Sequence, residues 1–163
     1  MAMYSLPTDA RLLFIGGALD GYTRLLARHA LPPHHYVPWF ASQQVRQFVS
    51  QSIGNNLVLI GHSYGASTAA TLVANGLSVH TLITLDPVGW QRPALANIPG
   101  HCQLWLNFRA ADRRHCFANV VARAGGWWQH RPRAFAHQHI DIAFDHALMV
   151  TPALKMLGLN ARA

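Results

Sequence analysis

The chain has 163 residues, of which 51% are hydrophobic and 12% are charged. These values are typical of one globular domain, here residues 1–163, and they exclude a disordered, charge-rich chain. Thirteen basic against six acidic residues give a formal net charge of +7 with eleven histidines counted as neutral, so we expect a basic surface.

Short apolar runs alternate with longer amphipathic segments along the chain, and turn residues separate them. In the first half the predicted elements are a strand at Arg11–Ile15 ended by Gly16 and Gly17, a helix from Asp20 to Ala30, a strand at His35–Phe40 weakened by Pro38, and a helix capped by Ser42 that runs to Ile53 and is closed by Gly54 and Asn55. Further along they are a strand at Asn56–Gly61, a helix over Tyr64–Ala74, strands at Val79–Leu85 and His101–Arg109, a helix from Arg113 to Ala124, a loop over Gly125–Ala136, a strand at His139–Phe144 and a helix over Ala147–Leu157.

Strands that alternate with helices form right-handed βαβ units, in which the strands lie parallel and the helices cover both faces of the sheet. We therefore predict a three-layer αβα sandwich with a mostly parallel sheet of about six strands. Ligands bind at the carboxyl ends of such strands, so polar residues that directly follow a strand are the candidates for chemistry.

The most informative of these positions is the motif G-x-S-x-G at residues 61–65, Gly-His-Ser-Tyr-Gly. It lies between an apolar strand that ends at Ile60 and a helix of small residues that begins at Tyr64, where a sharp turn forces the serine into a strained backbone conformation. A serine hydroxyl becomes a nucleophile when a neighbouring base removes its proton. Ser63 is therefore the candidate nucleophile, and the alternative is a plain turn in which Ser63 caps the helix.

At this motif, with its flanking strand and helix, the chain resembles the α/β-hydrolase family, and elsewhere the likeness is one of element order. The resemblance implies a serine, an acid and a histidine in that chain order, each on a different loop. It also implies a reduced member of the family without a cap domain, because only about fifteen residues separate Asp86 from the next strand.

The resemblance implies that the catalytic base lies in the loop between the last strand and the last helix. His146 occupies that loop. His137 and His139 lie before or at the start of the same strand, at its opposite end, and they are the alternatives.

Two aspartates compete for the role of the acid, which would orient His146 and stabilise its imidazolium. Asp86 closes the strand after the nucleophile helix, in a Leu-Asp-Pro setting similar to that of the pancreatic-type lipases. Asp112 follows the next strand, where many family members place the acid, but its arginine neighbours would explain it as an ion pair. We favour Asp86, and we expect Asp145 to be structural.

The resemblance also implies an oxyanion hole, with one donor after the nucleophile and one after an earlier strand. The first would be the backbone N–H of Tyr64, and the second that of Gly17 or Ala18, because glycine lets the backbone approach a substrate closely. The alternative for this glycine pair is a plain turn. Candidates for an apolar acyl pocket, which could equally belong to the core, are Trp90, Trp127 and Trp128.

These residues predict hydrolysis of a carboxylic ester, of a small molecule or a lipid, through an acyl-enzyme and without a metal or an organic cofactor. One alternative keeps this chemistry but acts on thioesters with a phosphopantetheine arm or on phospholipids, which a basic surface would favour. Another is a non-catalytic binding module on a hydrolase fold.

The remaining expectations concern partners and location. The arginines are dispersed and accompany no nucleic-acid-binding motif, so we expect no nucleic-acid partner. The sequence shows no secretory signal and no apolar run of about 18 residues, which predicts a cytoplasmic protein without an integral membrane segment. Cys102 and Cys116 can form at most one disulfide.

Overall fold

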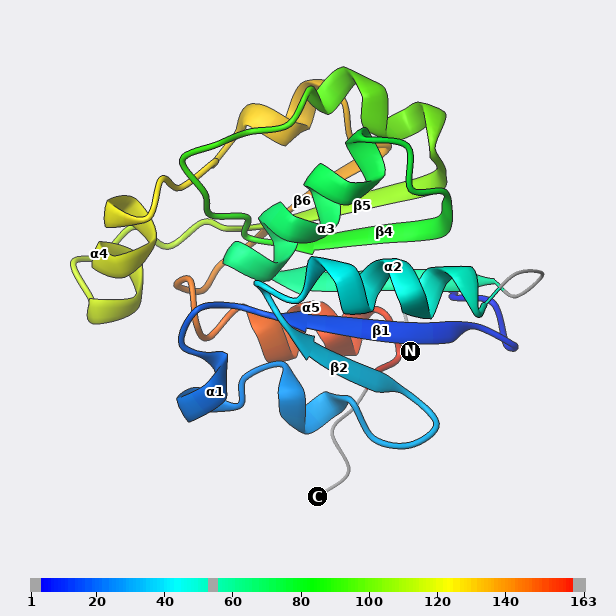
Figure 1. Ribbon diagram of the computed structural model, residues 1–163. Coiled ribbons are helices and arrows are strands. Elements are labelled where there is room, and N and C mark those ends of the chain that lie inside the picture. Colours follow the sequence, from blue (N-terminus) through cyan, green and yellow to red (C-terminus); the bar gives the residue numbers. More distant parts are fainter. Residues whose placement is uncertain (1–3, 53–55, 160–163) are drawn as a thin grey trace.

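The computed structural model describes residues 4–52 and 56–159, and within them six strands form one parallel sheet in the order β2-β1-β3-β4-β5-β6 (Figure 1). The strands are β1 (Arg11–Gly16), β2 (His35–Pro38), β3 (Leu57–His62), β4 (Val79–Leu85), β5 (Cys102–Ala110) and β6 (Gln138–Ile142). The α-helices are α1 (Asp20–Thr23), α2 (Ser42–Ser50), α3 (Tyr64–Ala74), α4 (Phe117–Ala124) and α5 (Val150–Met156), and the 3-10 helices are η1 (Ala27–His29), η2 (Leu95–Gly100) and η3 (Arg131–Ala134).

Two apolar cores lie on opposite faces of this sheet. Successive side chains of a strand point to opposite faces, so Leu13 packs with the core under α2 and α3, whereas Leu12 packs with the core under α5. Figure 1 shows α2 and α3 in front of the sheet and α5 behind it. Every residue of β3 is buried, as a central strand covered on both faces requires.

The strand order reverses between β1 and β3, because the chain leaves β1 for β2 on one side and returns to β3 on the other. In open α/β sheets the crevice at the carboxyl ends of two such strands is the usual ligand site. The turn after β3 packs tightly here: a Cβ at Gly65 would fall on the carbonyl oxygen of Ile15, so only glycine lets α3 begin this close to β1.

The helix predicted from Asp20 to Ala30 is wrong, because it is broken into α1 and η1. Arg24 adopts a left-handed conformation, with φ 50°, directly after α1. The buried carboxylate of Asp20 accepts the backbone N–H groups of Leu26 at 2.7 Å and Ala27 at 3.1 Å. The Asp20 side chain thus accepts hydrogen bonds from backbone N–H groups that, in a continuous helix, would bond to backbone carbonyl groups.

Several predicted boundaries also move. Ser42 is the first residue of α2 and Ala41 its N-cap, so the predicted capping role of Ser42 is wrong. The predicted end of this helix at Ile53, with Gly54 and Asn55, lies outside the described residues. Strands β3 and β5 each begin and end one residue later than predicted, whereas α3 and β4 have their predicted bounds.

The last two helices begin later than predicted because side chains hold the preceding turns. The side chain of Asn119 donates to the carbonyl groups of Asp112 and Arg114, and α4 begins only at Phe117. Likewise, Asp145 accepts the N–H groups of residues 147 and 148, and α5 begins only at residue 150.

Candidate active site

Asp86 follows β4 and His146 follows β6, and their side chains meet at 2.6 Å, from carboxylate Oδ2 to imidazole Nδ1. Both side chains are buried, with 1% and 7% of their surface exposed. Because a carboxylate only accepts hydrogen bonds, Nδ1 carries the proton and Nε2 is left with its lone pair. Asp86 also accepts the indole N–H of Trp127 at 2.8 Å and the backbone N–H of Ala110 at 3.0 Å, which fix its orientation.

The alternative acid, Asp112, and the alternative bases, His137 and His139, contact other residues. Asp112 binds the guanidinium of Arg114 at 2.6 Å, the ion pair that its sequence neighbours suggested. At the start of β6, His137 accepts the backbone N–H of Trp105 at 2.9 Å. His139 lies against Asn107 of β5, with 3.0 Å between Nδ1 and the amide nitrogen. The described contacts therefore bring Asp86, and not Asp112, to His146.

Ser63 lies in the turn between β3 and α3 with φ 57° and ψ −123°, a conformation that residues other than glycine rarely adopt. Its side chain makes no capping hydrogen bond to α3, so helix capping does not explain it. Strain of this kind is concentrated at functional sites. Among the described residues, no hydrogen bond joins the Ser63 hydroxyl to His146, although both line the same cavity. Such bonds often tighten only when substrate binds.

The predicted oxyanion donors surround Ser63. A Cβ at Gly17 would lie 2.8 Å from Cβ of Ser63 and 3.4 Å from its Oγ, so the backbone of Gly17 lies directly against the serine. Within the described residues, the backbone N–H groups of Gly17, Ala18 and Tyr64 donate to no protein acceptor. Tyr64 opens α3, where unpaired N–H groups and the helix dipole favour negative charge. All three residues line the same cavity as Ser63, with no protein acceptor for their amides in the described part of the chain.

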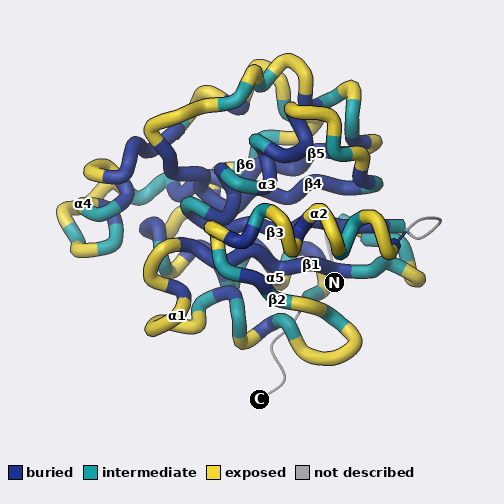
Figure 2. The backbone as a smooth tube through the Cα atoms, viewed as in Figure 1, coloured by how far each residue is buried: buried dark blue, intermediate teal, exposed yellow. Residues whose placement is uncertain are grey.

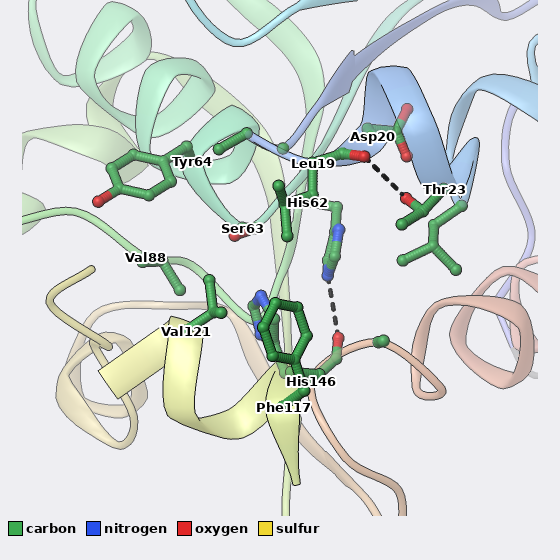
Figure 3. Close-up of a pocket in the computed structure, with 15 residues that line it drawn as sticks. Leu19, Asp20, Thr23, His62, Ser63, Tyr64, Val88, Phe117, Val121 and His146 are labelled. Atoms are coloured by element: carbon green, nitrogen blue, oxygen red, sulfur yellow. Dashed lines mark hydrogen bonds between the residues drawn. The ribbon is translucent and has the colours of Figure 1, made fainter. Parts of the chain in front are cut away.

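A cavity of about 110 Å³ opens beside Ser63 and His146 (Figure 3). Apolar side chains dominate its wall, and they come from the β1–α1 loop, the segment after α1, the loop after β4, α4 and the loop after β6. The large ones among them are Leu19, Leu25, Val88, Phe117 and Val121. Asp20 also lines the cavity, but its carboxylate is occupied by backbone amides. The cavity therefore suits an apolar group placed next to the serine.

Two residues that support His146 were missed by the sequence analysis. The Nε2–H of His62 donates to the carbonyl oxygen of His146 at 3.0 Å, and the two rings lie 4.8 Å apart (Figure 3). Burial, with a smaller contribution from the nearby imidazole of His146, lowers the pKa of His62 to about 3, so the His62 imidazole is neutral. The buried side chain of Asn119 accepts the backbone N–H of His146 at 3.0 Å. His62 lies inside the G-x-S-x-G motif, whereas nothing in the local sequence marks Asn119.

The three tryptophans predicted to line the pocket lie elsewhere, which corrects that prediction. Trp90 is 71% exposed and lines a separate groove. Trp127 is buried and donates to Asp86, so it supports the acid instead of contacting the cavity. Trp128 is buried in the core under α3, where its indole N–H donates to the carbonyl oxygen of Gly89 at 2.9 Å. Indole groups need a hydrogen-bond partner when buried, and both partners lie outside the pocket.

The described part of the chain contains no cluster of three or more His, Cys or Asp side chains that could hold a metal ion. Cys102 and Cys116 are free thiols, and burial raises the pKa of Cys102 to about 11. None of the described helices has the length and apolar character needed to cross a membrane.

No protein-family model and no curated protein matches the chain. Among solved structures, it is similar to a protein provisionally assigned as a YdeN-like hydrolase from Pectobacterium atrosepticum, with a TM-score of 0.50 and 16% identity over 87% of this chain and 82% of that one. It is also similar to TT1662 from Thermus thermophilus, with a TM-score of 0.52 and 14% identity over 96% of this chain and 92% of that one. Identities this low show the fold alone. The predicted fold class, an α/β sandwich with a parallel sheet of six strands, is confirmed.

Proposed function

We propose that this protein is a serine hydrolase that cleaves carboxylic esters with an apolar acyl group through an acyl-enzyme. The observation that carries the proposal is the buried Asp86–His146 pair, 2.6 Å apart, whose histidine lines the same cavity as Ser63. The strained backbone of Ser63 and the provisional hydrolase assignment of one structural neighbour add support.

The residues have distinct roles in this reaction. Nε2 of His146 removes the hydroxyl proton as Oγ of Ser63 attacks the ester carbonyl carbon, and the Asp86 carboxylate stabilises the imidazolium. The backbone N–H of Tyr64, with that of Gly17 or Ala18, binds the oxyanion. The imidazolium then protonates the leaving alcohol, and water, activated by the same imidazole, attacks the acyl-enzyme and releases the acid.

Labelling with a fluorophosphonate probe, followed by mass spectrometry of the modified residue, tests the proposal. We expect one adduct, on Ser63, in the native protein. It should be absent from Ser63→Ala and lost or greatly slowed in His146→Ala. His137→Ala is the matched control, since that histidine lies at the other end of β6, and it should label like the native protein. No labelling of the folded native protein would refute the enzymatic proposal and favour a binding module.

A pair of substrates with the same acyl chain, one an oxygen ester and one a thioester, then separates the two leaving-group classes. The apolar cavity contacts the acyl side of either substrate, so we expect similar KM values. A large preference in kcat for the thioester would change the proposed substrate class but not the proposed nucleophile.

A further inference from the structure

Exposed apolar side chains surround the mouth of the cavity. Leu19 and Phe117 line the cavity and are nevertheless 42% and 76% exposed. Tyr22 on α1, Val120 on α4 and Leu148 after β6 each stand next in the chain to a residue that lines the cavity, and all three are exposed. We call these five residues the apolar rim.

The apolar rim lies where the molecule can meet a flat surface. In Figure 1, α1 and α4 lie beyond the carboxyl ends of the strands, and Figure 2 shows exposed residues on both. Single exposed apolar residues are normal on soluble proteins, but a group of them around one opening marks an interaction site.

The charges around the rim are positive. Arg24 ends α1, Arg113 precedes α4 and Arg123 lies on α4, and all three are exposed and form no salt bridge within the described residues. The six acidic residues of the chain are all aspartates, and none is an exposed, unpaired neighbour of the rim. Asp20, Asp86 and Asp145 are buried, and Asp112 and Asp141 bind arginines. Asp9 precedes β1, at the amino ends of the strands. The exposed, unpaired charges at this edge are therefore positive.

We infer that the apolar rim docks on the surface of an anionic lipid bilayer. Apolar side chains framed by arginines fit such a surface, because the side chains enter the boundary between headgroups and acyl chains while the arginines face the lipid phosphates. Docking in this orientation turns the mouth of the cavity toward the lipid. The inference concerns binding and is independent of the hydrolysis proposed above.

Sedimentation with lipid vesicles tests it, using Ser63→Ala so that no lipid is consumed. One set of vesicles is pure phosphatidylcholine, and the other is an equimolar mixture with phosphatidylglycerol. We expect binding to the mixed vesicles at low salt, weaker binding at high salt, and much weaker binding to phosphatidylcholine alone. Within this background, Arg24→Gln should weaken binding to the mixed vesicles about fivefold.

The apolar contribution is tested with the combined change Tyr22→Ser, Val120→Ser and Leu148→Ser, which should weaken binding at least about tenfold. The matched control is Phe135→Ser, because Phe135 is 41% exposed but lies before β6, at the opposite edge of the sheet. It should bind like the parent. Thermal melting followed by circular dichroism checks that each variant is folded.

The outcomes separate docking from catalysis. Absence of binding to mixed vesicles, or equal binding by the combined variant and the parent, overturns the docking inference and favours a protein partner for this face. Either result can occur in a protein that still reacts with the fluorophosphonate probe. Conversely, vesicle binding by a protein that the probe does not label supports docking and refutes only the proposed hydrolysis.

Discussion

Replacing Asp86 by asparagine preserves the shape of the side chain but turns one acceptor oxygen into an NH2 donor. In the structure, Oδ2 accepts from the imidazole of His146 and the indole of Trp127, and Oδ1 accepts from the backbone of Ala110. An amide has a single oxygen, which can occupy either the Oδ1 or the Oδ2 position. If it takes the Oδ2 position, the NH2 group faces the N–H of Ala110. If it takes the other, the NH2 group faces the indole N–H, and His146 must carry its proton on Nε2, the tautomer that cannot act as the base for Ser63.

Both arrangements leave a buried donor without an acceptor, which costs about 1–3 kcal/mol of the free energy of unfolding. The corresponding change in a Ser-His-Asp hydrolase lowers kcat by about 10⁴-fold through the wrong tautomer, and we expect a loss of about 10³- to 10⁴-fold for Asp86→Asn. The matched control is Asp112→Asn. It weakens a surface ion pair with Arg114, so we expect little loss of stability.

The rates can be measured with a p-nitrophenyl ester and with the fluorophosphonate probe, and the stabilities by urea denaturation. The assignment of Asp86 as the acid would be refuted if Asp86→Asn retained activity within about tenfold of the native protein. The same holds if Asp112→Asn lost as much activity as Asp86→Asn while remaining folded.

Three further predictions follow from single contacts. Gly17→Ala inserts a Cβ 2.8 Å from that of Ser63, so the turn must shift, and esterase activity should fall about 100-fold with a lower melting temperature; native activity in this variant would refute the close packing of Gly17 against Ser63. Because burial lowers the pKa of His62 from 6.5 to about 3, the unfolded chain binds a proton below pH 6.5 that the folded chain does not. The stability that neutral His62 contributes is thus complete above pH 6.5 and falls by up to about 1.4 kcal/mol per pH unit toward pH 3. In urea titrations, the free energy of unfolding of His62→Gln should therefore fall less steeply with decreasing pH than that of the native protein. The same slope in both proteins would contradict this prediction. Trp127→Phe removes one hydrogen bond to the Asp86 carboxylate and should cost about 1.5–3 kcal/mol of stability, measured by the same titration, whereas a neutral effect would mean that the bond contributes nothing.

Local sequence patterns predicted the elements well where the backbone satisfies its own hydrogen bonds. Helix α3 and strand β4 have their predicted bounds, because runs of small or β-branched apolar residues end at clear turn signals. The patterns were wrong where a distant or buried side chain supplies the hydrogen bonds. Asp20 breaks the predicted first helix, and Asn119 delays the start of α4.

By itself, the sequence determined the parallel α/β architecture and the place of Ser63 in a sharp turn between a buried strand and a helix, since hydrophobic periodicity and glycine spacing are local properties. It also placed Asp86, Asp112 and His146 after strands, which in a parallel sheet brings them to one edge.

Only the tertiary structure decided which acid meets His146. Asp86 and Asp112 follow neighbouring strands, and the sequence favoured Asp86 without excluding Asp112. In the structure, Asp112 is paired with an arginine two residues away, whereas Asp86 reaches the imidazole across the sheet. The tertiary structure likewise took the tryptophans out of the pocket and built its wall from α1 and α4. These contacts join residues far apart in the chain, and their geometry depends on how whole elements pack, which no local pattern encodes.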